Sequence, residues 1–239
     1  MNASANKQAL VTGGARGIGR GAAIALADAG YAVLATGLTE AEISAAKPHP
    51  GVSYARLDVT DDAAVKDLIG GLGRLDALVN AAGIIQRGGK EFEVDAFRLT
   101  LEVNLVGTMR ACVVAHDKLA ANGGAIVNVA SMLSFFGAPL APGYAASKGG
   151  VAQLTKSLAA AWAADGVRVN AVAPGWIATD LTQALQDDTA RSAAILARTP
   201  MGRWGSADDI GPVVQFLMSD AARFITGTIL PVDGGYLTV

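Results

Sequence analysis

The sequence predicts an α/β protein in which a parallel sheet is covered by helices on both faces. Short apolar runs alternate with helical patterns, as in parallel strands joined by crossover helices. Of the 239 residues, 51% are hydrophobic but only 5% are aromatic and 17% charged, and small aliphatic side chains suit strands buried on both faces. No internal repeat or linker divides the chain, so we expect one doubly wound domain over residues 1–239.

Seven strands are expected at the short apolar runs. They are Gln8–Thr12, Ala32–Thr36, Val52–Leu57, Leu75–Asn80, Ala125–Ala130, Val167–Val172 and Thr228–Val232.

The segments between these strands have helical patterns. Helices are expected at Gly17–Ala29, from Asp61 to about Gly71, Val94–Asn122, Gly143–Asp165 and Ser206–Ser219. Gly30 suits the end of the first helix, and the carboxylates of Asp61 and Asp62 suit the dipole at the start of the second. The stretch Val94–Asn122 is expected to be broken near its start. A polar helical insertion is expected at Thr179–Arg198.

Charge and hydropathy exclude two classes of partner. The net charge of −2 and the pI near 5.7 give no basic surface for nucleic acid. The uncharged stretch Gly124–Ser147 is long enough to span a bilayer, but its prolines and glycines would interrupt a membrane helix. Cys112 is the only cysteine and is expected in a buried helix, and the N-terminal stretch does not resemble a signal peptide. We therefore expect a soluble, cytoplasmic protein without a membrane partner.

A glycine-rich turn, TGGARGIG at Thr12–Gly19, lies between the first strand and the first helix. Glycines there let the backbone approach a pyrophosphate, which binds at the helix N-terminus. Glycine also serves ordinary tight turns, but this placement favours a nucleotide site. The spacing of Gly13, Gly17 and Gly19 differs from the G-x-G-x-x-G pattern.

The pattern T-G-x-x-x-G-x-G resembles the short-chain dehydrogenase/reductase family. Further motifs of that family follow in order: NAAG at Asn80–Gly83, Asn104, Ser131, YAASK at Tyr144–Lys148, and Pro174–Gly175. Ala81 departs from the family, which usually has a second asparagine there. The resemblance implies a Rossmann-like fold and an oxidoreductase that transfers a hydride between NAD(P) and a secondary alcohol or ketone.

The resemblance also implies which residues bind the cofactor. They are Gly13, Arg16, Gly17, Ile18, Gly19, Leu38, Asp58, Val59, Asn80, Ala81, Ala82, Gly83, Tyr144, Lys148, Pro174, Gly175, Ile177 and Thr179. Asp58 either lies beside the adenine or is a turn or N-cap carboxylate.

The choice between NAD and NADP depends on the end of the second strand. An acidic side chain there recognises the ribose of NAD, whereas a nearby arginine accepts the 2′-phosphate of NADP. Gly37 and Leu38 occupy the acidic and arginine positions of the family and provide neither signal. Arg16 could reach a 2′-phosphate, the diphosphate or solvent. The pattern favours NAD and leaves NADP open.

Tyr144 and Lys148 are the strongest catalytic candidates. They stand four apart at a predicted helix start, so they lie on one face, and a nearby ammonium lowers the pKa of a tyrosine toward that of a usable base. Ser131 ends a strand and could bond the substrate oxygen. By resemblance, Asn104 holds a water that relays protons to Lys148. Taken alone, Tyr144 and Lys148 could be a surface pair, Ser131 a loop hydroxyl, and Asn104 an interruption of a helix. No Cys/His cluster has metal-ligand spacing.

Three stretches indicate the substrate class. AAGIIQR (81–87), ASMLSFFG (130–137) and RSAAILARTPMGRWG (191–205) resemble 2-deoxy-D-gluconate and 2-dehydro-3-deoxy-D-gluconate dehydrogenases. The resemblance favours a sugar acid or polyol. Arg87 either meets a substrate carboxylate or is a solvated charge. Met132 and Trp176 are further substrate candidates, and residues 176–205 would form a mobile lid.

Two other functions remain open. A 3-oxoacyl-thioester (acyl-carrier-protein) reductase shares the core motifs. A dinucleotide-sensing regulator would need the glycine turn but not the Tyr144–Lys148 pair. By resemblance, the chain forms a homotetramer or homodimer.

Overall fold

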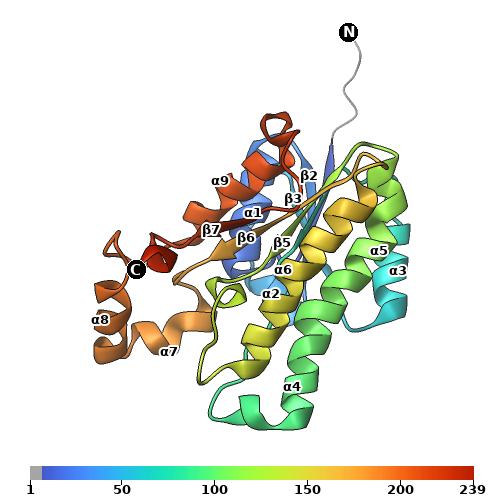
Figure 1. Cartoon of the computed structure of the whole chain (residues 1–239). Helices are drawn as coiled ribbons and strands as arrows, with labels where there is room; N and C mark the ends of the chain where they lie inside the picture. Colours follow the sequence, from blue (N-terminus) through green and yellow to red (C-terminus); the bar gives the residue numbers. More distant parts are fainter. Residues whose placement is uncertain (1–6) are drawn as a thin grey trace.

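The computed structural model describes residues 7–239; residues 1–6, part of the stretch compared above with a signal peptide, lie outside the described residues. One parallel sheet runs through the molecule in the strand order β3-β2-β1-β4-β5-β6-β7 (Figure 1). Its strands are β1 (Gln8–Thr12), β2 (Ala32–Gly37), β3 (Val52–Arg56), β4 (Ala77–Asn80), β5 (Ala125–Val129), β6 (Arg168–Pro174) and β7 (Ile229–Val232). The predicted fold class is confirmed, and the predicted strands differ from these only at their ends.

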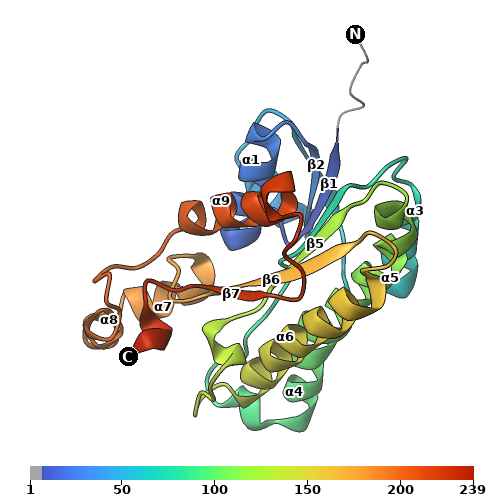
Figure 2. The same ribbon diagram turned by 45° about the horizontal axis from the view of Figure 1, so that its top comes forward.

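Helices cover both faces of this sheet (Figures 1 and 2). One face packs against α1 (Gly17–Asp28) and α9 (Ala207–Met218), and the other against α3 (Asp62–Gly70), α5 (Gly107–Ala120) and α6 (Pro142–Trp162). Along β1, Val11 belongs to the first core and Leu10 to the second, and both are fully buried. Successive strand residues thus point into opposite cores, which explains the apolar composition.

The helical layer differs from the sequence prediction at two places. A short helix, α2 (Glu40–Ala45), was not predicted; none of its residues is buried, so it shows no hydrophobic periodicity. The predicted helix over 94–122 is α4 (Val94–Leu101) followed by a π-helical turn, η2 (Glu102–Val106), and then α5. The break therefore comes one helix into the stretch, at the turn that carries Asn104.

The insertion after β6 is helical, as predicted, and projects beyond the sheet (Figures 1 and 2). It contains η4 (Asp180–Thr182), α7 (Gln183–Gln186) and α8 (Thr189–Ala197). Trp204 at its end meets Trp176 edge-on at 6.0 Å, and Trp176 meets Tyr236 at 6.3 Å between ring centroids. These rings tie the insertion to the C-terminal turn η6 (Tyr236–Thr238). In residues 7–239, no helix combines the length and apolarity that a membrane span requires.

Candidate functional site

A cleft of about 380 Å³ opens at the carboxyl ends of the strands, where doubly wound sheets bind their ligands. Its walls include the following predicted residues: Gly13, Arg16, Gly17, Ile18, Gly19, Leu38, Asp58, Val59, Ala81, Ala82, Gly83, Tyr144, Lys148 and Thr179. A second hollow, of about 390 Å³, lies at the amino ends of β1 and β2, and within residues 7–239 no ionisable side chain lines it. The first cleft is therefore the candidate active site.

The glycine turn fits a dinucleotide because it has no side chains at Gly13 and Gly19, where the backbone of neighbouring residues comes close. Gly13 has a φ of 63°, and a Cβ there would stand 2.7 Å from the Cα of Ala82. A Cβ on Gly19 would collide with the carbonyl oxygen of Gly13. The N-cap residue of α1 is Arg16, and its side chain accepts no hydrogen bond from the helix. The first backbone N–H groups of α1 are therefore not capped by that side chain. These groups suit a pyrophosphate, and the residues present fit NAD(P).

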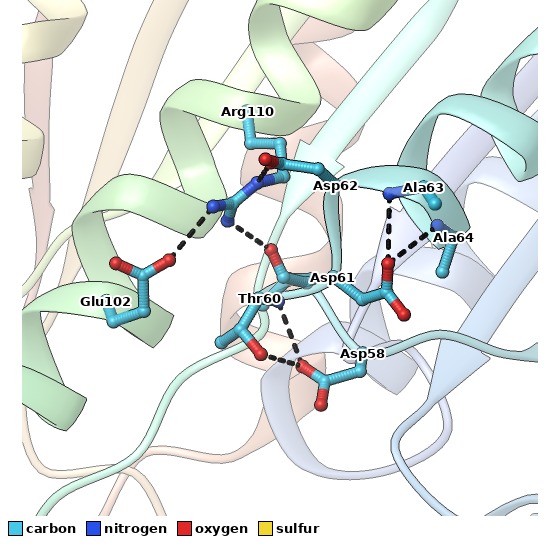
Figure 3. A network of polar contacts seen from close by, with 9 residues as sticks. Asp58, Thr60, Asp61, Asp62, Ala63, Ala64, Glu102 and Arg110 are labelled. Atoms are coloured by element: carbon cyan, nitrogen blue, oxygen red, sulfur yellow. Dashed lines mark hydrogen bonds and ion pairs between the residues drawn. The ribbon is translucent and has the colours of Figure 1, made fainter.

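The loop after β3 forms another wall and is held by polar contacts (Figure 3). The Oδ1 of Asp58 accepts hydrogen bonds from the backbone N–H and hydroxyl of Thr60, at 2.9 and 2.7 Å. Asp58 therefore closes a turn as well as lining the cleft. Arg110 of α5, which sequence motifs did not indicate, donates to the carbonyl of Val59 at 2.6 Å and pairs with Asp62 and Glu102. Arg110 thus fixes this loop against α5 and η2.

Tyr144 and Lys148 lie on one face of α6 and both line the cleft. The Nζ of Lys148 stands 5.6 Å from the centroid of the Tyr144 ring and donates to the carbonyl of Val129 at 2.6 Å. Ser131 begins the turn η3 (Met132–Ser134) and is buried. Ser134 of that turn donates to the carbonyl of Lys148 at 2.7 Å, so η3 and α6 hold each other.

Burial sets the pKa values of both groups. It raises the pKa of Tyr144 to about 12, although the nearby Ser131 hydroxyl and Arg87 guanidinium lower it and the Glu91 carboxylate raises it further. It lowers the pKa of Lys148 to about 8. The expected lowering of the Tyr144 pKa by Lys148 is absent here, because desolvation of the phenolate dominates. A buried Lys148 with a lowered pKa also carries less charge with which to act on the phenol.

Asn104 is fully buried in the π-helical turn and clamps the loop after β4. Its Oδ1 accepts from the N–H of Ile84 at 2.8 Å, and its Nδ2 donates to the carbonyl of Ile84 at 2.9 Å. A Cβ built on Gly83 would lie 3.3 Å from this Oδ1 and 3.6 Å from the Nζ of Lys148. A bare glycine thus leaves space between Asn104 and Lys148, in the place where a relaying water is expected.

Glu91, which the sequence interpretation missed, is a buried carboxylate that holds Tyr144. It lies on η1 (Lys90–Phe92) and is 2% exposed. Its Oε2 accepts from the N–H of Tyr144 at 2.9 Å, and its Oε1 accepts from the N–H of Gln86 at 2.8 Å. Ala141, the N-cap residue of α6, has no side chain that can accept a hydrogen bond from the first turn of the helix. The Glu91 carboxylate, which comes from another segment, accepts that hydrogen bond instead. No local motif identifies such a contact.

Several predicted residues lie outside the cleft walls. Asn80 is buried, and its Nδ2 donates to the Oδ1 of Asn128 at 2.9 Å and to the Sγ of Cys112 at 3.2 Å. The side chain of Asn80 thus joins β4 to β5 and α5 in the interior, and its predicted contact with the cofactor stays a prediction. Cys112 is buried on α5, as predicted, and burial raises its pKa to about 12.

The remaining predicted residues are also absent from the cleft wall. They are Arg87, Asn104, Ser131, Met132, Pro174, Gly175, Trp176 and Ile177. Met132 is 4% exposed and packs in the interior, and its predicted contact with substrate stays a prediction. Gly175 must be bare, since a Cβ would stand 2.7 Å from the Cα of Asp233. Arg87 is exposed at the rim and donates to the carbonyl of Leu181 in the insertion.

Comparison with known proteins agrees with this geometry. A family profile described as "Enoyl-(Acyl carrier protein) reductase" matches residues 13–237. A 2-dehydro-3-deoxy-D-gluconate 5-dehydrogenase of Bacillus subtilis is 44% identical, with 97% of this chain and 95% of that protein covered. A cis-4-hydroxycyclohexanecarboxylate dehydrogenase of Sinomonas cyclohexanicum is 40% identical, with 99% of each covered.

The chain belongs to the short-chain dehydrogenase/reductase family. A crystal structure of another member, a gluconate 5-dehydrogenase of Burkholderia cenocepacia in complex with NADP and tartrate, superposes with a TM-score of 0.91. That protein is 36% identical, and the match covers 98% of this chain and 96% of the other. This short-chain dehydrogenase is accordingly an NAD(P)-dependent oxidoreductase that acts on secondary alcohols or the corresponding ketones. Within residues 7–239, no group of His, Cys, Asp and Glu side chains is arranged to hold a metal ion.

Proposed function

We propose that this enzyme interconverts the secondary alcohol and ketone of a small carboxylic acid, specifically a sugar acid. The observation that carries the proposal is the Tyr144–Lys148 pair in one cleft with the glycine turn, with the Arg87 guanidinium close enough to lower the pKa of Tyr144. The Bacillus and Sinomonas relatives are both named for substrates that combine a carboxylate with an oxidisable carbon, which supports the same class here.

Tyr144 exchanges a proton with the substrate oxygen, and Ser131 donates a hydrogen bond to that oxygen. When bound, the nicotinamide supplies or accepts the hydride, and its oxidised ring carries a positive charge. Lys148 orients the cofactor and supports the phenol. Asn104 fixes the loop at Ile84 and, with the space beside Gly83, allows a water to reach Lys148.

The substrate carboxylate meets Arg87, whose planar guanidinium can bind it through two hydrogen bonds. Because Arg87 also donates to Leu181, it joins the cleft rim to residues 176–205, which act as the lid. Trp176, the first residue of this lid, packs it against the C-terminal turn through Tyr236 and is the lid's candidate for contact with the substrate. In this proposal the 239 residues form one cytoplasmic domain that assembles as a homotetramer or homodimer.

The test is a cofactor-linked absorbance assay, with NAD and NADP as hydride acceptors for the alcohols and NADH and NADPH as hydride donors for the 3-oxoacyl thioester. The substrate panel contains 2-dehydro-3-deoxy-D-gluconate, gluconate, a polyol without a carboxylate and a 3-oxoacyl thioester. We expect kcat/KM to be highest for a sugar acid and to fall more than about tenfold in Arg87→Gln, as removal of a charge-assisted pair requires. The reductase description of the family profile keeps the thioester in the panel. Preference for the thioester, or for the polyol, would overturn the proposal.

A further inference from the structure

Glu42, on the unpredicted helix α2, lines the cofactor cleft at the end of β2. Its Oε2 accepts a hydrogen bond from the N–H of Leu38 at 2.8 Å. Its Oε1 accepts one from the Nε of Arg16 at 3.3 Å. Gly37 occupies the position where the family can carry an acidic residue. Glu42, five residues later, brings a carboxylate to the same end of β2.

Arg16 is also engaged by a second carboxylate. Its Nη1 stands 3.7 Å from the Oδ2 of Asp180, at the base of the lid. Two negative groups therefore face one positive group in this part of the cleft. Arg56 stands nearby, but its Nε donates to the carbonyl of Leu38 at 3.2 Å, and its side chain is not part of the cleft wall.

These contacts bear on which dinucleotide can bind. A carboxylate at the end of the second strand accepts a hydrogen bond from the ribose 2′-hydroxyl of NAD. A 2′-phosphate needs an unengaged arginine and is repelled by a carboxylate at short distance. Among the residues that the structure describes, Arg16 is the only arginine in the cleft wall, and Glu42 already pairs with it.

We propose that Glu42 makes this enzyme prefer NAD over NADP. It does so by accepting the ribose hydroxyl and by holding Arg16 away from a 2′-phosphate. The inference rests on the dinucleotide part of the proposed function and not on the identity of the substrate. It separates this chain from the Burkholderia relative, which was crystallised with NADP.

The test measures equilibrium dissociation constants of NADH, NADPH and 2′,5′-ADP by fluorescence and calorimetry, without any substrate. The variants are Glu42→Gln, Arg16→Ala, the double variant, and Glu40→Gln as the matched control. Glu40 is an exposed acid of the same helical turn that is not part of the cleft wall. The ratio of kcat/KM for NAD to that for NADP is measured on any substrate that turns over.

We expect the wild-type enzyme to bind NADH at least about tenfold more tightly than NADPH, as one charged contact can discriminate. Glu42→Gln should weaken the binding of NADH and strengthen the binding of NADPH and 2′,5′-ADP. The ratio of the NADPH to the NADH dissociation constant should then come near one. The double variant should not bind NADPH more tightly than wild type does, since the stronger NADPH binding of Glu42→Gln depends on Arg16. Glu40→Gln should keep the wild-type ratio.

Tighter wild-type binding of NADPH than of NADH would overturn the inference, as would a ratio that Glu42→Gln does not change. Normal NADH selectivity with no turnover of any sugar acid would overturn only the proposed substrate class. Failure of both dinucleotides to bind a folded enzyme would remove both proposals.

Discussion

The Oε2 of Glu91 accepts a hydrogen bond from the backbone N–H of Tyr144, 53 residues later in the chain. Its other oxygen accepts from Gln86, next to Arg87. One buried carboxylate therefore ties the start of the helix that carries the phenol to the loop that carries the candidate substrate arginine. Glu91 touches no reacting atom and is a positioning residue.

Replacing Glu91 should separate catalysis from cofactor binding. In Glu91→Ala we expect kcat to fall tenfold to a hundredfold, the order that misplacement of a reacting group costs. The dissociation constant of NADH should stay unchanged because the glycine turn is not contacted. The Glu91 charge raises the pKa of Tyr144, so its removal lowers that pKa and moves the pH profile of kcat for alcohol oxidation to lower pH.

Two further variants make this result specific. Glu91→Gln keeps one acceptor oxygen and should recover part of kcat, while its lost charge should still shift the pH profile. Glu93→Gln removes an exposed acid two residues away and should change neither quantity. A kcat for Glu91→Ala within about twofold of wild type, in a folded protein, would contradict the positioning role.

Tyr144→Phe should abolish turnover while leaving the cofactor bound. The variant keeps the ring but removes the proton that the mechanism transfers, so kcat should fall at least about a hundredfold. The NADH dissociation constant should remain near that of the wild-type enzyme. Tyr54→Phe is a matched control, because its hydroxyl contacts the carbonyl of Lys47 outside the cleft. Retention of more than about a tenth of the activity would refute the role of Tyr144.

Most of the sheet could be predicted from the sequence because its central strands β1, β4, β5 and β6 are buried along almost their whole length, although the edge strands β3 and β7 are less so. In β5 all five residues are buried and four of them are apolar, with Asn128 paired to Asn80, so the strand leaves a strong apolar signal in the sequence. The glycine turn was equally predictable, since Gly13 and Gly19 occupy positions where a side chain would collide. Burial and backbone collisions act on each position separately and therefore leave a local signal.

The residues missed act through contacts between distant segments. Glu91 reaches Tyr144, and Arg110 reaches Val59, 51 residues earlier. Glu42 lies on a helix without a buried face, so no periodicity marked it. In each case the residue type is ordinary for an exposed position, and only the fold shows that its charge faces the site. The sequence predicted a lowered pKa for Tyr144, whereas burial in the fold raises it, and burial of this residue is not visible in a local motif.

The lowered pKa of Lys148 predicts that stability rises with pH. Its pKa is about 8 in the folded protein and 10.5 in the unfolded chain. Between these values the unfolded chain binds more protons, so raising the pH favours the folded state. From pH 7.5 to 9.5 this one group should add about 2 kcal/mol to the free energy of unfolding, measured by urea titration.

The control for that prediction lies on the same helix. Lys148→Met should lack this increase, whereas Lys156→Met, at an exposed position of α6, should keep it. The quantity compared is the difference between each variant and wild type across the pH range, because other groups contribute equally to both. Parallel curves for wild type and Lys148→Met would show that burial does not lower the pKa of Lys148.

Gly83→Ala should impair proton relay by filling the space between two polar groups. The added methyl would lie 3.3 Å from the Oδ1 of Asn104, a tight contact that requires a shift of a few tenths of an ångström, and 3.6 Å from the Nζ of Lys148. A water there would be displaced, so kcat should fall about tenfold, with an increased solvent isotope effect on kcat and an unchanged NADH dissociation constant. Gly149→Ala, next to Lys148 but with open space at its Cβ, should leave kcat unchanged. If the loss in Gly83→Ala appeared entirely as weaker NADH binding, the methyl would be obstructing the cofactor, and the space beside Gly83 would have no part in proton relay.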